Sequence, residues 1–194
     1  MEDWGRTAQK IRVPLGTAIG IIFLLLMHPS MRSITLGAIV AFAGAGFRIW
    51  ASGNIIKGKV LAQSGPYAYT RNPLYFGSFI MALGVLVSGQ GFWLIIPFCL
   101  FFAAIYYPVM KAEERELIQG HGDNFRAYVR RVPFFFPAFR AKPVNASSFS
   151  WDRVLKNREH RTIAGLLLIE AFLICLALTG IRITSLLASL FFGS

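Results

Sequence analysis

Charged residues are scarce in this sequence. They make up 15% of its 194 residues, whereas a soluble domain carries about a quarter. Hydrophobic residues reach 55%, and the mean hydropathy is +0.55. This balance excludes a string of ordinary soluble domains and predicts one compact integral membrane protein.

Acidic residues are scarcer than basic ones. Nine Asp and Glu stand against 20 Lys and Arg, which gives a formal net charge of +11. In a soluble protein that charge would suggest nucleic acid as a partner. In a membrane protein, basic residues gather on the cytoplasmic side and meet anionic lipid. We therefore exclude nucleic acid and expect membrane lipids as partners.

Cysteine is nearly absent. The sequence has two, Cys99 and Cys175, both within apolar runs and without Cys-x-x-Cys spacing. This pattern indicates neither a disulfide framework nor a metal site.

Long hydrophobic runs, in contrast, predict about five transmembrane helices. Their expected positions are residues 14–28, 33–50, 73–88 and 92–110, and a last run from Ile163 to about Thr179. The expected fold is therefore all-α, a polytopic membrane helical bundle. Small residues in the second run, Gly37, Gly44 and Gly46 among them, favour close helix packing.

Two parts of the chain are expected. Residues 1–142 form a core of four helices with a cytoplasmic segment at 111–137, and residues 143–194 form a basic interfacial segment and the last transmembrane helix. Residues 151–161 mix apolar and basic side chains, as in a helix on an anionic membrane surface. The apolar stretch 163–192 is longer than a bilayer, so its helix either tilts strongly or breaks near Gly180.

Basic residues also predict the orientation in the membrane. Eleven of the 20 Lys and Arg lie from Lys111 to Arg161, and seven more lie in the N-terminal segment and from Arg48 to Arg71. The positive-inside rule places these segments and the N-terminus in the cytoplasm. The turns near Arg32 and at residues 88–91 then face the other side.

An irregular stretch precedes the third helix on the cytoplasmic side. Residues 65–77 read GPYAYTRNPLYFG. Gly65 permits a positive φ, Pro73 suits the first turn of a helix, and the free amides of that turn can face an anion. The stretch is either the mouth of a pocket or an ordinary loop with interfacial tyrosines.

Two motifs narrow this choice. GPY at 65–67 and RNPLYFG at 71–77 resemble the GxY…RHPxYxG signature of the isoprenylcysteine carboxyl methyltransferase and phospholipid methyltransferase superfamily. EEREL at 113–117, GDNFRAY at 122–128 and VPFFFP at 132–137 look like its EExxL…GxxYxxY…VPxFxP tail. Two motifs in this order, separated by a helical hairpin, are a specific signal.

The resemblance covers residues 50–137 and implies a membrane enzyme that binds S-adenosyl-L-methionine in a cytoplasmic pocket. A glutamate suits the amino group of that cofactor, and Arg71 with the free amides near Pro73 suits its carboxylate. The candidates for cofactor binding are Gly65, Tyr67, Arg71, Asn72, Pro73, Tyr75, Gly77, Glu113 and Glu114. Arg71 and Glu114 are also candidates for catalysis. Tyr128, in the tail motif, and the intramembrane carboxylate Glu170 are candidates for substrate binding.

Each candidate also has a plainer interpretation. The two glutamates can pair with neighbouring basic residues on the surface, Arg71 can reach lipid phosphate, and the tyrosines can belong to an aromatic belt. His121 is either a base for an amine acceptor or part of a polar turn. Glu170 either pairs with Arg182 or lines a lipid-accessible opening.

The sequence departs from the superfamily pattern at two positions. Asn72 stands where His is usual, and Phe125 where Tyr is usual. Asn forms hydrogen bonds but carries no proton at neutral pH, which argues against an acid–base role at position 72. Asn72 is thus the feature that favours the alternative, a non-catalytic membrane scaffold or transporter-like protein.

The expected reaction is methyl transfer to a lipophilic or membrane-embedded acceptor. A carboxylate or thiolate acceptor is already ionised, whereas a lipid amine must first lose a proton. The sequence offers no compelling base, which slightly favours a carboxylate or thiol acceptor over a lipid amine.

Overall fold

The computed structural model describes residues 2–55, 61–138 and 149–180. Their long helices are α1 (Glu2–Leu26), α2 (Met31–Asn54), α3 (Pro73–Ser88), α4 (Ile95–Arg131) and α6 (Glu159–Thr179). Short helices η1 (Gly65–Ala68), η2 (Phe92–Leu94) and α5 (Trp151–Lys156) connect them. The described residues contain no strand, so the predicted all-α bundle is confirmed.

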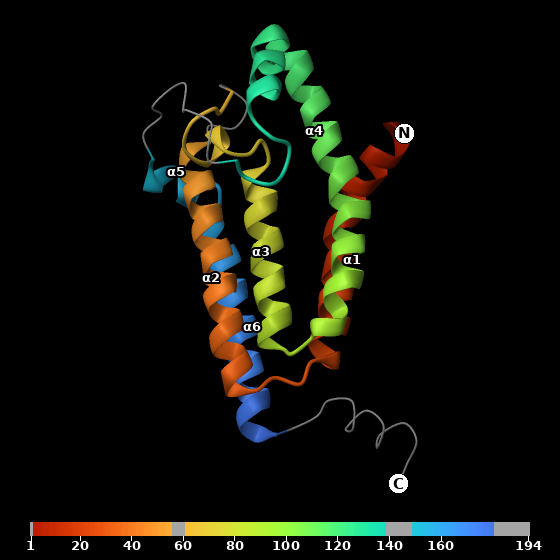
Figure 1. The fold of residues 1–194 in the computed structure, drawn as a ribbon, viewed down its shortest axis with the longest axis vertical. Helices are drawn as coiled ribbons and strands as arrows, with labels where there is room; N and C mark the ends of the chain where they lie inside the picture. The colour runs from red at the N-terminus through yellow and green to blue at the C-terminus, as the bar shows by residue number, and fades with distance from the viewer. Residues whose placement is uncertain (1, 56–60, 139–148, 181–194) are drawn as a thin grey trace.

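The bundle has two ends that differ in character. The loop between α2 and α3 and the tip of α4 lie at one end, which we call the motif end (Figure 1). The turns at 27–30 and 88–91 lie at the other, the turn end. The start of α1 also lies toward the motif end.

Four helices are long and apolar enough to cross a membrane, at Thr7–Leu26, Met31–Asn54, Phe92–Arg131 and Glu159–Thr179. α3 is apolar but shorter, with 16 residues. Its boundaries are those predicted, because Pro73 occupies the first turn and Gly89 caps the end. The described chain leaves the helical conformation at Gly180, which has φ +65°, and the predicted course beyond it lies outside the described residues.

Four helices extend beyond their predicted limits, α2 and α6 by up to four residues at an end and α1 and α4 by more. α1 begins at Glu2 and carries Pro14 inside it. α4 continues to Arg131 because the segment after residue 110 is rich in strong helix formers such as Lys, Ala, Glu and Leu. Gly122, with φ +53°, interrupts α4, and the chain turns back there toward the bundle (Figure 1).

α2 and α3 pack closely along small residues. A Cβ atom on Gly44 would lie 2.5 Å from the Met81 amide nitrogen, and one on Gly84 would lie 2.3 Å from the Ala41 nitrogen. The predicted close packing of the second helix is therefore confirmed at Gly44, whereas Gly46 has no neighbour within 4 Å. α6 packs beside this pair, and α1 runs along α4 (Figure 1).

An aromatic cluster joins α3 to α4. Phe79 packs against Phe98 and Phe102, with ring centroids 5.5 and 5.0 Å apart. Phe135, from the extended chain after α4, packs 5.7 Å from both Phe79 and Phe102. The tail motif is therefore anchored in the core of the bundle.

Candidate functional site

The loop before α3 begins with a tight turn. Gly65 has φ +57°, and a Cβ atom there would lie 2.7 Å from the side chain of Asn54 at the end of α2. Only glycine fits both the dihedral angle and the space. η1 follows and buries Pro66 and Tyr67.

The two sequence motifs are joined by hydrogen bonds. The Arg71 amide donates to the Pro133 carbonyl at 3.0 Å, and the Ala138 amide donates to the Tyr69 carbonyl at 2.9 Å. The Asn72 side-chain amide donates to the Phe134 carbonyl at 2.9 Å. Asn72 thus holds the tail motif against the loop, a task that needs a donor and no titrating proton.

The reversal of α4 brings the end of this helix against the loop. Residues after Gly122 fold back so that the Tyr128 hydroxyl donates to the Tyr67 carbonyl at 2.7 Å. Phe125 is buried beside Tyr128, with ring centroids 5.9 Å apart. Phe125 lacks the hydroxyl of the tyrosine that is usual at this position, and its ring packs in the interior.

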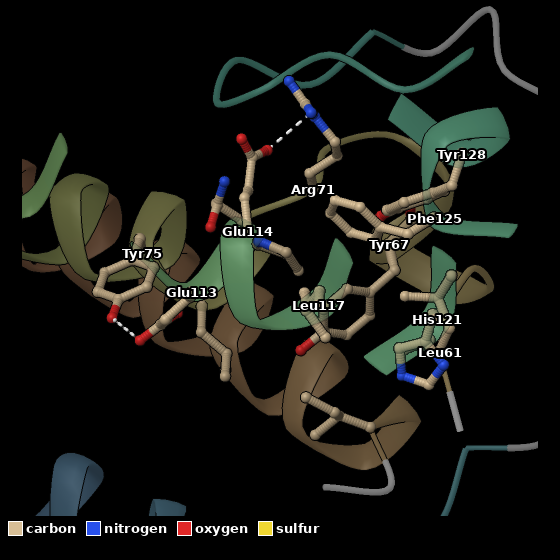
Figure 2. Close-up of a pocket in the computed structure, with 15 residues that line it drawn as sticks. Leu61, Tyr67, Arg71, Tyr75, Glu113, Glu114, Leu117, His121, Phe125 and Tyr128 are labelled. Carbon is tan, nitrogen blue, oxygen red and sulfur yellow. Dashed lines mark hydrogen bonds and ion pairs between the residues drawn. The ribbon is translucent and has the colours of Figure 1, made fainter. Parts of the chain in front are cut away.

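A cavity of about 230 Å³ lies between the loop and α4. Figure 2 shows a polar side of the cavity, where Tyr75 pairs with Glu113 and Arg71 pairs with Glu114. The apolar side includes Leu61, Leu117 and Phe125. The residues that line the cavity are Ile55, Leu61, Ala62, Tyr67, Arg71, Asn72, Pro73, Leu74, Tyr75, Glu113, Glu114, Leu117, His121, Phe125 and Tyr128.

A buried ion pair connects the loop before α3 to α4. Arg71 Nη1 lies 2.7 Å from Glu114 Oε1, and both side chains are 10% exposed. Lys111 Nζ donates to the other oxygen of Glu114 at 3.0 Å. The Lys111 ammonium also lies 4.4 Å from the centre of the Phe134 ring, a cation–π contact.

Glu113 belongs to a second, more exposed cluster. The Tyr75 hydroxyl donates to Glu113 Oε1 at 2.7 Å. Arg12, from α1, donates to the Tyr75 hydroxyl and lies 3.6 Å from the same carboxylate oxygen. The three side chains come from α3, α4 and α1, so this cluster ties the cavity to the N-terminal helix.

Three buried polar atoms at the cavity have no hydrogen-bond partner among the described residues: Tyr67 Oη, Arg71 Nε and Glu114 Oε1. The 2.7 Å contact of Arg71 with Glu114 is an ion pair that lacks hydrogen-bond geometry, so both groups retain hydrogen-bonding capacity. Burial raises the pKa of the Tyr67 hydroxyl well above its usual range. That hydroxyl therefore stays protonated and can donate a hydrogen bond.

Most of the predicted site residues meet at this cavity. Those that line it are Tyr67, Arg71, Asn72, Pro73, Tyr75, Glu113, Glu114 and Tyr128. Gly65 and Gly77 do not line it: Gly65 forms the turn against Asn54, and Gly77 packs against Arg48.

Glu170 lies away from the cavity. Its carboxylate accepts a hydrogen bond from the Ser88 hydroxyl at 3.0 Å, and Ser88 ends α3 at the turn end. The partner predicted for it, Arg182, lies outside the described residues.

Sequence reasoning missed several residues of the site. Arg12, one of the basic residues of the N-terminal segment, does not line the cavity, and its contact with Glu113 depends on the packing of α1 against α4. Leu61 and Leu117 carry no chemical signal in the sequence. His121, weighed as a base or a polar turn, lines the cavity immediately before the break at Gly122.

The donor set fits the amino-acid part of S-adenosyl-L-methionine. Arg71 Nε offers a donor to a carboxylate, and Glu114 Oε1 offers an acceptor to an ammonium group. The apolar side of the cavity, with Leu61, Leu117 and Phe125, offers a slot for a heteroaromatic ring. The described residues contain no group of three or more His, Cys, Asp or Glu that could hold a metal ion.

Comparisons with known proteins agree with the two motifs. Residues 30–124 match the family model for phospholipid methyltransferase. The chain is 32% identical over 95 residues to the protein-S-isoprenylcysteine O-methyltransferase of Schizosaccharomyces pombe, covering 49% of this chain and 40% of that protein. No solved structure matches the chain significantly.

Two further relatives carry names of another kind. The cobalt-zinc-cadmium resistance protein CzcN of Cupriavidus metallidurans is 35% identical over 107 residues, which cover 54% of this chain and 49% of that protein. The nickel-cobalt-cadmium resistance protein NccN of Alcaligenes xylosoxydans xylosoxydans is 33% identical over 104 residues, or 53% and 47% of the two chains. The chain spans about half the length, or less, of these three relatives.

The matched segment includes the loop at 65–77 and both glutamates of the cavity. These matches support the resemblance of the two motifs to the superfamily of the isoprenylcysteine carboxyl methyltransferases and the phospholipid methyltransferases.

Proposed function

We propose that this protein is an S-adenosyl-L-methionine-dependent membrane methyltransferase that acts on a lipophilic acceptor. The observation that carries the proposal is the cavity between the loop and α4, where Arg71 and Glu114 form a buried ion pair. Arg71 Nε and Glu114 Oε1 have no hydrogen-bond partner there among the described residues. When bound, the cofactor supplies an electrophilic methyl group on a sulfonium sulfur.

Arg71 and Glu114 are assigned to the zwitterionic end of the cofactor. A zwitterion brings a carboxylate and an ammonium group together, and the two orphaned atoms have the matching polarity. Arg71 Nε takes no part in the ion pair, and Glu114 Oε1 can accept a hydrogen bond while it stays paired with Arg71 Nη1, so binding requires no separation of the pair. Lys111 holds the second oxygen of Glu114 and so fixes the orientation of its carboxylate.

Methyl transfer requires alignment more than chemical activation. Donor, methyl and nucleophile must lie in line, and holding them so supplies much of the rate. The loop is well suited to this because its backbone is held to the tail motif by the Arg71, Asn72 and Ala138 hydrogen bonds. The cavity volume of about 230 Å³ is slightly below the ~300–1,000 Å³ of drug-sized ligand pockets, so the ligand fills it and extends through its mouth.

The acceptor enters on the polar side in this proposal. Glu113, Tyr75 and Arg12 form the more exposed cluster there, and Glu113 and Arg12 are 40% and 32% exposed. A carboxylate or thiolate acceptor requires no base, whereas a lipid amine would transfer its proton to Glu113 or to water. Both acceptor classes remain within the proposal.

The test is calorimetric titration of S-adenosylhomocysteine into the detergent-purified protein. We expect saturable binding that weakens at least about tenfold in Arg71→Ala and Glu114→Gln, since each removes a charged hydrogen-bond partner. Asp123→Asn is the matched control, because Asp123 lies on the same helix as Glu114 and is fully accessible in its pair with Arg126. Its affinity should equal that of the parent.

Absence of binding by the folded parent, in detergent and again in nanodiscs, would contradict the proposal. The non-catalytic scaffold or transporter-like alternative would then be favoured. Binding that is equally tight in the parent, Arg71→Ala and Glu114→Gln would retain the cofactor and reject the assigned residues.

A further inference from the structure

A buried ion pair joins α2 to α6 outside the cavity. Arg48 Nη2 donates to Glu159 Oε1 at 2.8 Å, and Arg48 Nε donates to Glu159 Oε2 at 3.1 Å. The side chains are 18% and 6% exposed. This bidentate geometry fixes the orientation of the guanidinium plane.

The third guanidinium nitrogen of Arg48, Nη1, contacts the start of α3. Nη1 donates to the Leu74 carbonyl at 3.3 Å and also to the Ser78 hydroxyl. Leu74 lines the cavity, and it directly follows Arg71, Asn72 and Pro73 in the chain. The position of Arg48 therefore bears on the position of the loop that carries the assigned cofactor residues.

The segment before α6 is attached to the end of α2. The Ser150 amide donates to the Gly53 carbonyl at 3.1 Å, and the Asn157 side-chain amide donates to the Ser52 carbonyl at 3.1 Å. Carbonyl groups in the last turn of a helix lack partners within the helix, so these bonds complete the end of α2. Phe149 packs over Gly53, where a Cβ atom would lie 2.2 Å from its ring.

We propose that Glu159 is a positioning residue for the cavity, acting through Arg48 on the first turn of α3. Glu159 and the segment 149–158 lie outside residues 30–124, which match the family model. In this view the last described helix stabilises the site in addition to crossing the membrane. Without Glu159, the Arg48 guanidinium lacks a counter-ion in a buried position and turns toward solvent. The Leu74 carbonyl then loses its bond from Arg48 and keeps only that from the Ser78 hydroxyl among the side-chain donors of the described residues.

The test measures the loop directly by hydrogen–deuterium exchange of the amides in residues 69–77. In Glu159→Gln we expect exchange in this segment to accelerate by about tenfold or more, because local opening becomes easier. Glu159→Asp keeps the charge on a shorter side chain and should give an intermediate rate, which keeps the test usable if Glu159→Gln does not fold. Exchange is independent of any ligand.

Ser88→Ala is the matched control. It removes a buried hydrogen bond between α3 and α6 at the turn end of α3. Glu159→Gln likewise weakens a buried contact of α6, but with α2 and near the cavity. A merely structural role for Glu159 predicts that both variants lose thermal stability and leave exchange at 69–77 unchanged. That result, or acceleration confined to α2 and α6, would overturn the proposal.

S-adenosylhomocysteine titration of the same variants separates this proposal from the proposed function, on which its link to activity rests. Weaker binding by at least about fivefold in Glu159→Gln, with Ser88→Ala unchanged, is expected. If the parent does not bind at all, the proposed function fails, and the exchange experiment still decides whether Glu159 positions the loop.

Discussion

At the scale of single residues, the hydroxyl of Tyr67 is the sharpest indicator of a ligand. It is buried at the cavity without a hydrogen-bond partner among the described residues. An unsatisfied buried polar group costs about 1–3 kcal/mol, so Tyr67→Phe should be at least as stable as the parent. If the hydroxyl contacts the ligand, S-adenosylhomocysteine should bind about fivefold to tenfold more weakly.

The pH dependence of this contact follows from burial. The pKa of the folded Tyr67 hydroxyl lies above its unfolded value, which is about 10. The group is therefore protonated in both states below about pH 10, and its ionisation reduces stability only above that pH. The affinity ratio of Tyr67→Phe to the parent should stay constant from pH 6 to 9, and a ratio near one would remove Tyr67 from the site.

Asn72 gives a second prediction at this scale. Its side-chain amide is buried and donates to the Phe134 carbonyl. Asn72→Ala leaves that carbonyl without its donor and should cost about 1–3 kcal/mol. Asn72→His keeps a donor and should retain more of the parental melting temperature. Equal melting temperatures for the parent and Asn72→Ala would show that the bond contributes nothing.

The site residues illustrate what the sequence could and could not predict. Tyr67, Arg71 and Glu114 were predicted because motif residues have fixed spacing and recognisable chemistry. Arg12 was not, since its role arises from the packing of α1 beside α4. The hydrogen bond by which Asn72 holds the tail motif could not be predicted from the sequence either, because its acceptor lies 62 residues away.

At the scale of elements, the break in α4 completes the cavity. Gly122 has φ +53°, and a Cβ atom there would have no neighbour within 4 Å. Only the positive φ therefore disfavours an alanine at this position. Gly122→Ala should destabilise the protein by about 1 kcal/mol and weaken S-adenosylhomocysteine binding, because Phe125 and Tyr128 follow the turn. Thermal unfolding and calorimetry measure the two effects.

Gly120 provides the control for that substitution. It also has open space around it but has no positive φ. Gly120→Ala should therefore stabilise the helix by about 0.5–1 kcal/mol. If the two variants behave alike, the backbone at Gly122 imposes no special requirement.

Helix existence was predicted well, and helix ends less well. α3 matched its expected limits because Pro73 and Gly89 mark them chemically. The end of α4 did not, since hydrophobicity indicates where a membrane span stops, whereas helix propensity continues into the polar segment at 111–121. The reversal at Gly122 depends on a single dihedral angle, which periodicity cannot reveal.

At the scale of the whole molecule, the close contact of α2 with α3 holds the bundle together. Gly44→Ala would place a methyl group 2.5 Å from the Met81 amide nitrogen, which is backbone and cannot yield without moving a helix. We expect a loss of about 1–3 kcal/mol from such overpacking. Gly46→Ala, on the same helix with open space, should cause no loss. Similar melting temperatures for both would contradict the packing.

Orientation in the membrane is the remaining property at this scale. The cavity and the start of α1 lie at the motif end, and 18 of the 20 Lys and Arg flank helices on the side predicted to be cytoplasmic. Gln90, at the turn end, and Asp123, at the tip of α4, are both exposed. Single cysteines at these positions, with Cys99 and Cys175 replaced by Ser, can be labelled in intact cells with a membrane-impermeant maleimide.

Gln90→Cys should react in intact cells, and Asp123→Cys should react only after permeabilisation. The physical reason is the cost of moving many basic side chains across the membrane, which holds the positively charged end on the cytoplasmic side. Labelling of both positions after permeabilisation controls for accessibility in the folded protein. The reverse pattern would place the cavity outside the cytoplasm, away from the intracellular supply of the cofactor, and would count against the proposed reaction as well as the topology.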